Sequence, residues 1–215
     1  MDQLPAAPEP GEQTADAEPA KPQKRGGGFL RGVLEIIETL VLTFVIFFVI
    51  QNFVAQPFEV HQWSMQHTFE PKDYVLVDKL TIRFTPYERG DVVVFTPPDG
   101  WGPDKTPFIK RVIGVPGDEV EIRDGAAWVN GTKLDEPYLF AADDGVIEPT
   151  EALSDKTAWK VQPGELFVMG DHRMQSQDSR AFGPIPQDSV IGRGFVRYWP
   201  IAKFSLVQRP TYPAP

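Results

Sequence analysis

Residues 108–131 read FIKRVIGVPGDEVEIRDGAAWVNG, and this stretch predicts a β-rich fold. Short runs of β-branched and apolar residues alternate in it with turn-forming residues. Asp124-Gly125 and Asn130-Gly131 are the strongest turn signals, because two-residue hairpin turns need a positive φ at both positions and these residue types tolerate it. The stretch therefore predicts adjacent antiparallel strands joined by tight turns.

The same strand-like pattern continues on both sides of this stretch. Further short apolar runs occupy residues 74–77, 92–95, 166–169 and 194–199. No long segment after Phe58 shows a convincing 3.6-residue period, which argues against a helical domain. We predict a mostly β fold: an antiparallel β domain over residues 57–206, with a smaller β subdomain at about 125–163 and a C-terminal tail at 207–215.

A charge-free segment precedes the predicted β domain. From Thr39 to Phe58 no side chain is charged, and residues 40–50 read LVLTFVIFFVI. A helix rises 1.5 Å per residue, so about 20 residues reach roughly 30 Å, the thickness of a bilayer core. We predict one transmembrane anchor helix at residues 29–56.

Two other interpretations of the apolar segment are a cleaved signal peptide and a buried core helix. The best site for signal-peptide cleavage after a small residue would follow Ala55. That site places the large Phe53 at position −3 and Pro57 just beyond the cut. About thirty mostly polar residues also come first, whereas a signal peptide begins with a short basic region. These features favour an uncleaved anchor.

The residues before the anchor predict its orientation. Residues 1–28 are rich in Pro, Ala, Gly and charge, so we expect a disordered tail. Four basic residues lie close to the start of the span: Lys21, Lys24, Arg25 and Arg31. Because basic flanks stay in the cytoplasm, we expect a cytoplasmic N-terminus and the β domain on the outer face of the cell membrane.

Composition excludes several classes of function. The chain carries 21 basic and 30 acidic residues, and 17 of the basic and 23 of the acidic ones follow Ala55. Nucleic acid is therefore not an expected partner, because phosphate binding needs clustered positive charge. The chain has no cysteine and no His-x-x-x-His pair, so we expect no metal and no cofactor.

The histidines do not predict a Ser-His-Asp triad. The chain has three, and two of them, His61 and His67, stand three residues before and after Ser64. Side chains so close in an extended or turning segment rarely aim at one atom. The third, His172, lies far away in the sequence.

A lysine can replace histidine as the base if its pKa falls far enough for the amine to be neutral. The best placed is Lys110, within the apolar run 108–114. By pattern alone, such a lysine is more often found at a strand edge with its amine in water, so both interpretations stay open at this point.

Four segments together resemble the conserved boxes of bacterial type I signal peptidases, the leader peptidases. Residues 64–69, SMQHTF, resemble the Ser-Met-x-Pro-Thr-Leu box of that family. The other three follow in the family's order: 89–95 (RGDVVVF), 109–118 (IKRVIGVPGD) and 170–180 (GDHRMQSQDSR). The resemblance extends from the anchor to about Leu206.

The resemblance implies a serine endopeptidase with a Ser–Lys dyad. Ser64 would be the nucleophile, Lys110 the general base, and Ser176 the residue that orients the amine. Asp178 and Arg180 would pair and brace the site, while Met65 and Phe108 would cover the lysine with apolar groups.

The resemblance also implies the partners. Substrates would be secretory preproteins with small residues, typically Ala, at positions −1 and −3, and the enzyme would be a monomer in the bilayer. Apolar residues near the cleft would reach the bilayer interface, although we expect core packing for at least half of the four candidates. These candidates are Trp63, Phe69, Phe84 and Trp101.

The departures from the family pattern lie mainly around the nucleophile. Gln62 stands where the family has a Ser or Gly that, beside the backbone N–H of Ser64, helps to form the oxyanion hole. His67 replaces a proline, and His172 replaces an asparagine. Trp63 and Phe69 are further departures. Weakened activity or an altered substrate preference would follow from these differences.

Two alternative functions remain at this point. A self-cleaving repressor-like protease shares Ser–Lys chemistry, but it carries a DNA-binding module where this chain has an anchor and a Pro-rich tail. A degenerate homologue would bind leader peptides without cutting them.

Overall fold

The computed structural model describes residues 28–102, 105–142 and 144–212. The chain divides into two units, Met1–Phe44 and Val45–Pro215, and each is described by itself. The tail expected at residues 1–28 lies outside the described residues except for Gly28, and so does the end of the C-terminal tail.

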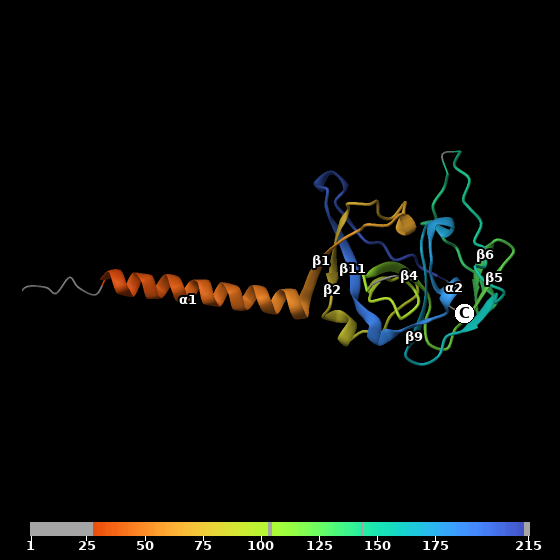
Figure 1. Cartoon of the computed structure of the whole chain (residues 1–215). Coiled ribbons are helices and arrows are strands. Elements are labelled where there is room, and N and C mark those ends of the chain that lie inside the picture. Colours follow the sequence, from red (N-terminus) through yellow and green to blue (C-terminus); the bar gives the residue numbers. More distant parts are fainter. Residues whose placement is uncertain (1–27, 103–104, 143, 213–215) are drawn as a thin grey trace, which may run out of the picture. The chain divides into compact units, whose positions relative to one another are not determined.

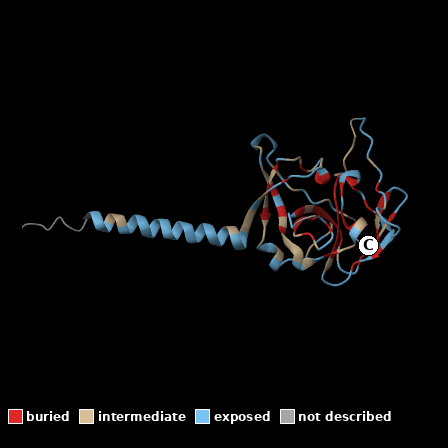
Figure 2. Ribbon diagram, viewed as in Figure 1, coloured by how far each residue is buried: buried red, intermediate tan, exposed pale blue. Residues whose placement is uncertain are grey.

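Helix α1, Gly28–Val49, contains the predicted apolar span (Figures 1 and 2). The span from Phe29 to Val54 is 26 residues long and apolar enough to cross a membrane, and its side chains are exposed. The α-helix gives way to a π-helical turn, Ile50–Val54, and strand β1, Ala55–Glu59, begins two residues before Pro57. The Asn52 amide donates a hydrogen bond to Phe48 O, a local bond of the kind that competes with regular helix geometry.

The second unit is built on an eight-stranded antiparallel sheet. Along the sheet the strands follow the order β1-β2-β11-β3-β4-β9-β10, and β12 pairs with β11. The bounds of the remaining strands are β2 Tyr74–Asp78, β3 Val92–Phe95, β4 Phe108–Gly114, β9 Glu165–Met169, β10 Ile185–Pro186, β11 Val190–Trp199 and β12 Ser205–Leu206. Strands β4, β9 and β11 therefore meet in one sheet although they are far apart in sequence (Figure 1).

A second, four-stranded sheet has the order β7-β6-β5-β8. Its strands are β5 Glu119–Arg123, β6 Ala126–Val129, β7 Thr132–Lys133 and β8 Ala158–Lys160. Asp124 and Gly125 have φ values of 52° and 69°, and Asn130 and Gly131 have 52° and 77°. The predicted hairpin at Asp124-Gly125 is present, and the predicted turn at Asn130-Gly131 joins β6 to β7. The second sheet starts at β5, before residue 125.

Strand β4 lies inside the large sheet, paired with β3 on one side and β9 on the other. Six of its seven residues are buried, and hydrophobic clusters pack on both of its faces. Short helical segments connect the strands: Trp63–Met65, Thr81–Arg83, Arg173–Gln175, Gln187–Ser189, Ile201–Lys203 and the α-helical turn α2, Ser179–Phe182. A lysine in β4 is therefore held in the interior rather than at an edge.

Candidate active site

Three segments that are distant in sequence meet at the candidate site. The first is the short 3-10 turn Trp63–Met65, which follows β1 and carries Ser64. The second is β4, which carries Lys110, and the third is the loop after β9, residues 170–180. Each side chain is placed by backbone that the sheet or a tight turn fixes.

Lys110 and Ser64 are in direct contact. The Lys110 Nζ donates a hydrogen bond of 2.6 Å to Ser64 Oγ, and both residues are about 98–99% buried. The ring centroid of Phe108 lies 5.3 Å from Nζ, and Met65 is fully buried beside the nucleophile. Apolar groups thus exclude water from the amine.

Burial lowers the pKa of Lys110 from its ordinary value of 10.5 to about 8. The cause is desolvation, because an ammonium ion loses its hydration in an apolar interior. The carboxylates of Asp178 and Asp171 oppose the shift by favouring the charged form. The result is an amine that is partly neutral near neutral pH, as a general base requires.

The loop after β9 approaches the nucleophile very closely at Gly170. A Cβ atom at this position would collide with Ser64 O and with Ser176 Oγ. Two residues later, the His172 N–H donates a hydrogen bond of 3.1 Å to Ser64 O. The absence of a side chain at Gly170 therefore lets the loop pack against the turn that carries the serine.

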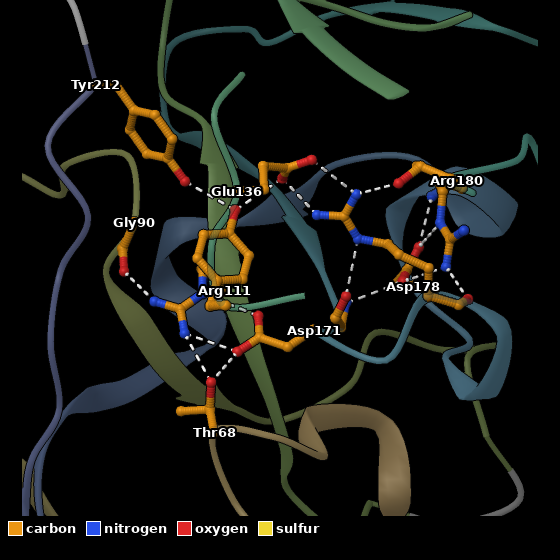
Figure 3. A network of polar contacts seen from close by, with 12 residues as sticks. Thr68, Gly90, Arg111, Glu136, Asp171, Asp178, Arg180 and Tyr212 are labelled. Atoms are coloured by element: carbon orange, nitrogen blue, oxygen red, sulfur yellow. Dashed lines mark hydrogen bonds and ion pairs between the residues drawn. The ribbon is translucent and has the colours of Figure 1, made fainter. Parts of the chain in front are cut away.

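Asp178 and Arg180 form a fully buried ion pair (Figure 3). Arg180 Nε and Nη2 each donate to a carboxylate oxygen of Asp178 at 2.9 Å, and the Gly170 N–H donates to the same carboxylate at 3.1 Å. Burial alone raises the pKa of Asp178, but the bonds from Arg180 outweigh it and hold the pKa below its usual value. The pair is therefore charged at neutral pH, and it braces the loop.

Two further buried ion pairs surround the site, and the sequence did not predict them. Arg111 binds Asp171 through two bonds of 2.9 and 2.7 Å, and Thr68 also donates to Asp171 (Figure 3). Arg173 pairs with Glu136 from the segment before the second sheet's last strand. Arg111 follows Lys110 directly, so strand alternation places it on the opposite face, but nothing in the sequence indicates its partner.

The structure leaves the roles of Ser176 and Gln62 as predictions. Ser176 Oγ is buried and makes no bond to the Lys110 amine in this structure. It lies close enough to the Asp178 carboxylate to contribute to the lowered pKa of Asp178, although its geometry is not that of a full hydrogen bond. Gln62 is exposed, in an extended conformation directly before the nucleophile turn, and its side chain does not cap that turn.

A small hollow of about 30 Å³ lies beside the nucleophile turn. Its wall comes from β1 and the chain that continues from it, from β3 and from the start of β4. The lining residues are Phe58, Glu59, Val60, His61, Gln62, Val94, Thr106, Pro107 and Ile109. A larger hollow of about 370 Å³ is lined in part by His67 and Arg111. Neither hollow is lined by Ser64 or Lys110, but the smaller one is lined by Ile109, the residue before Lys110, and by Gln62, which directly precedes the nucleophile turn.

A family model described as "Signal peptidase, peptidase S26" matches residues 33–199. The chain belongs to this family. A buried serine hydrogen-bonded to a buried lysine, at the positions that the resemblance named, lies within the matched region. The chain is therefore an enzyme, a signal peptidase of the serine protease class, and it removes signal peptides from preproteins.

Curated relatives agree with this assignment. The chain is 35% identical over 176 residues to a probable signal peptidase I-2 of Synechocystis, covering 81% of this chain and 77% of that protein. It is 34% identical to a signal peptidase I of Leptolyngbya laminosa, with 94% and 95% covered. Signal peptidase IB of Staphylococcus aureus is 35% identical, with 80% and 92% covered.

A solved structure is also similar to this signal peptidase. The crystal structure of a signal peptidase I from Enterococcus faecalis shares 33% identity and covers 51% of this chain and 97% of that chain, with a TM-score of 0.39. The family model and the curated relatives favour this assignment over a self-cleaving repressor. Together with helix α1, they fit a membrane-anchored protein.

Proposed function

We propose that this signal peptidase cuts its substrates by a Ser–Lys mechanism, with Ser64 as the nucleophile and Lys110 as the general base. The observation that carries the proposal is the 2.6 Å hydrogen bond between Lys110 Nζ and Ser64 Oγ in a site closed to water. A nucleophile and its base must lie within about 2.6–3.2 Å of each other, and the two atoms meet this requirement.

The proposed reaction has two halves. Ser64 Oγ attacks the scissile carbonyl carbon and passes its proton to neutral Lys110 Nζ. The tetrahedral intermediate collapses when the protonated Nζ donates that proton to the leaving amine, which leaves an acyl ester on Ser64. Lys110 then takes a proton from a water molecule that attacks the ester, and the proton returns to Ser64 Oγ as the signal peptide departs.

The oxyanion of each tetrahedral intermediate needs hydrogen-bond donors. The backbone N–H of Ser64 is the first candidate, and the amide of Gln62 is the second. In our proposal the Gln62 side chain turns toward the reacting carbonyl when substrate binds, because its amide is exposed and makes no bond that caps the turn. Ser176 Oγ, which is buried near Gly170 and makes no bond to Lys110 here, orients the amine once substrate is present.

The small hollow next to the nucleophile turn, lined in part by Gln62, supports a preference for small residues at positions −1 and −3. Phe58, Val94 and Ile109 give it apolar walls, and its size suits a methyl group better than a larger side chain. Strand β1 is at one end of the strand order, so an extended substrate can add to this edge through main-chain hydrogen bonds. Alternate substrate side chains would then point toward the enzyme.

The proposal is tested with a preprotein that carries Ala at positions −1 and −3, incubated with the full chain in detergent. We expect cleavage after the Ala at −1, and its loss in the Ser64→Ala variant. Replacing the substrate residue at −3 with Phe is expected to reduce cleavage by more than about tenfold, because the hollow excludes the ring. Equal cleavage of the Ala and Phe substrates would contradict the size limit, and cleavage by Ser64→Ala would contradict the nucleophile.

The pH profile gives a second test. Lys110 acts as a base only when neutral, and its pKa of about 8 means that the neutral fraction rises with pH. We therefore expect kcat/KM to increase about tenfold between pH 7 and pH 9 and then to level off. A profile that falls over this range would contradict a neutral lysine base, and an exposed lysine would instead give a rise centred above pH 10.

We also propose that the N-terminus faces the cytoplasm and the catalytic domain lies on the outer face. The basic residues before helix α1 support this orientation, because cytoplasmic flanks carry an excess of Lys and Arg. Protease added to intact cells whose outer surface is accessible should then digest the catalytic domain and spare residues before the span.

A further inference from the structure

His172 connects the nucleophile turn to a segment of the small subdomain. Its ring Nδ1 lies 3.1 Å from Gln66 Oε1, and its Nε2 lies 3.3 Å from Glu148 Oε2. The ring stacks on Phe140, with centroids 4.0 Å apart and planes 20° from parallel. The ring is thus held on two edges and one face, and the residue is 7% exposed.

Gln66 and His172 both belong to the structure that fixes Ser64. The Gln66 N–H closes the 3-10 turn by donating to Trp63 O at 2.9 Å. The His172 N–H bonds Ser64 O, so this histidine reaches the turn through its backbone at the serine and through its ring two residues further on. Movement of the His172 ring would therefore move the turn that aims Ser64 Oγ.

A second histidine holds the same segment of the small subdomain. His67 Nδ1 lies 3.0 Å from Leu139 O and 3.3 Å from Tyr138 O. The Phe140 N–H donates to Asp171 O at 3.2 Å. Residues 138–142 and 144–148, which we call the arm, therefore contact both the chain just after the nucleophile turn, at His67, and the loop at Asp171 and His172.

Glu148 supplies the polar anchor at the far end of the arm. Its Oε2 atom is shielded from solvent and accepts no hydrogen bond among the described residues. An unsatisfied buried carboxylate oxygen is unfavourable, and the facing His172 Nε2 is the group within reach that can donate to it. The Nε2 atom of the ring thus faces Glu148, and the Nδ1 atom faces Gln66.

We propose that His172 is a positioning residue for Ser64: its ring, clamped between Glu148 and Phe140 of the arm, holds Gln66 and thereby the nucleophile turn. The inference rests on the proposed Ser–Lys mechanism, since it assigns a cause to the orientation of that serine. His67 and His172 both differ from the family pattern. In this proposal neither residue weakens the site, because both hold the arm against it.

Two substitutions at His172 remove the contacts of its two ring nitrogens one at a time. In His172→Asn the side-chain amide can still reach Gln66 from the place of Nδ1 but is too short for Glu148. In His172→Gln the amide takes the place of Nε2 and reaches Glu148 but not Gln66. His172→Ala removes both contacts and the stacking on Phe140.

The experiment measures kcat and KM for cleavage of the Ala-x-Ala preprotein by these full-length variants. Small misplacements of a reacting group reduce the chemical step, so we expect kcat to fall about tenfold in His172→Gln and His172→Ala, with KM changed less than about twofold. In His172→Asn we expect kcat within about threefold of the parent. Glu151→Gln, an exposed carboxylate close to Glu148 in sequence, is the matched control and should behave as the parent.

Hydrogen exchange of the arm and of residues 63–66 provides the structural measurement. Exchange in the arm should be faster in His172→Asn and His172→Ala, and exchange at the turn should be faster in His172→Gln and His172→Ala. Equal kcat in the Asn and Gln variants, or losses that simply follow the midpoint of thermal unfolding, would overturn the proposal. If Lys110→Met cleaves normally, the dyad is wrong, and the exchange pattern at residues 63–66 still decides whether His172 holds the turn.

Discussion

The Lys110→Met variant should lose about 10⁴-fold in kcat/KM for preprotein cleavage, because it lacks the group that takes the proton from Ser64. Methionine fills nearly the same volume as lysine and has no titratable group. The hydrogen bond between Lys110 Nζ and Ser64 Oγ disappears, and nothing else in the site is as close to that oxygen among the described contacts. The serine would remain un-ionised and in place.

The same substitution is expected to leave the fold intact or to stabilise it. A shift of the Lys110 pKa from 10.5 to about 8 corresponds to a cost of about 3 kcal/mol for holding the ammonium form in the folded protein. Between these two values the unfolded chain binds more protons than the folded one, so the stability of the parent rises with pH. The gain in the methionine variant should therefore be largest below pH 8 and should shrink as the pH rises toward 10.5.

Two measurements test this prediction: cleavage rates, and urea unfolding of the full chain in detergent at pH 7 and pH 10. Lys160→Met, at an exposed position of β8, is the matched control and should keep both activity and stability. Normal turnover in Lys110→Met would remove lysine from the mechanism. Loss of activity together with a large loss of stability would instead give Lys110 a structural role.

The Asp178→Ala variant should unfold more easily by about 3–5 kcal/mol, the usual effect of removing one partner of a buried ion pair. Asp178 and Arg180 are both fully buried, and the substitution leaves the Arg180 guanidinium without its counter-charge. It also removes the acceptor of the Gly170 N–H. Because the folded pKa of Asp178 lies below its ordinary value of 3.8, the stabilising charge persists above that pH and is lost only as the pH falls through the folded value.

Thermal and urea unfolding of the full chain in detergent measure this loss. Asp155→Ala is the control, because Asp155 is an exposed carboxylate of the same domain, and its change should be within about 0.5 kcal/mol. We expect the parent and Asp178→Ala to become equal in stability well below pH 3.8, once Asp178 is protonated. A difference that does not depend on pH would show that the packing of the side chain, rather than its charge, is what matters.

Aromatic residues illustrate where sequence patterns stop being informative. Trp63, Phe69, Phe84 and Trp101 were four candidates for contact with the bilayer interface. Phe69 and Trp101 are buried, at 2% and 6% exposure, whereas Trp63 and Phe84 are 54% and 79% exposed. Core packing thus accounts for half of them, and no local property of the sequence separates the two groups, because exposure depends on which distant strands cover each ring.

The anchor shows a similar limit at its C-terminal end. Composition predicted the apolar span, but the expected end at residue 56 differs from the structure, where Ala55 already pairs with Asp78 of β2. Pro57 lies inside β1, so the pairing with β2, and not the proline, decides where the strand begins. A proline constrains only its own φ and the conformation of the residue before it. A neighbouring strand forms backbone hydrogen bonds along the whole length of the pair.

The sequence by itself determined most of the longer strands, the Asp-Gly hairpin and the mostly β fold class, because backbone preferences depend on neighbouring residues. Only the tertiary structure decided that Lys110 is buried and bonded to a serine 46 positions away, that Asp171 is the partner of Arg111, and that His172 fastens the arm to the nucleophile turn. Desolvation and ion pairing depend on which atoms come within a few ångströms of each other. Those distances arise when the large sheet brings β4 and the loop after β9 against the turn that follows β1.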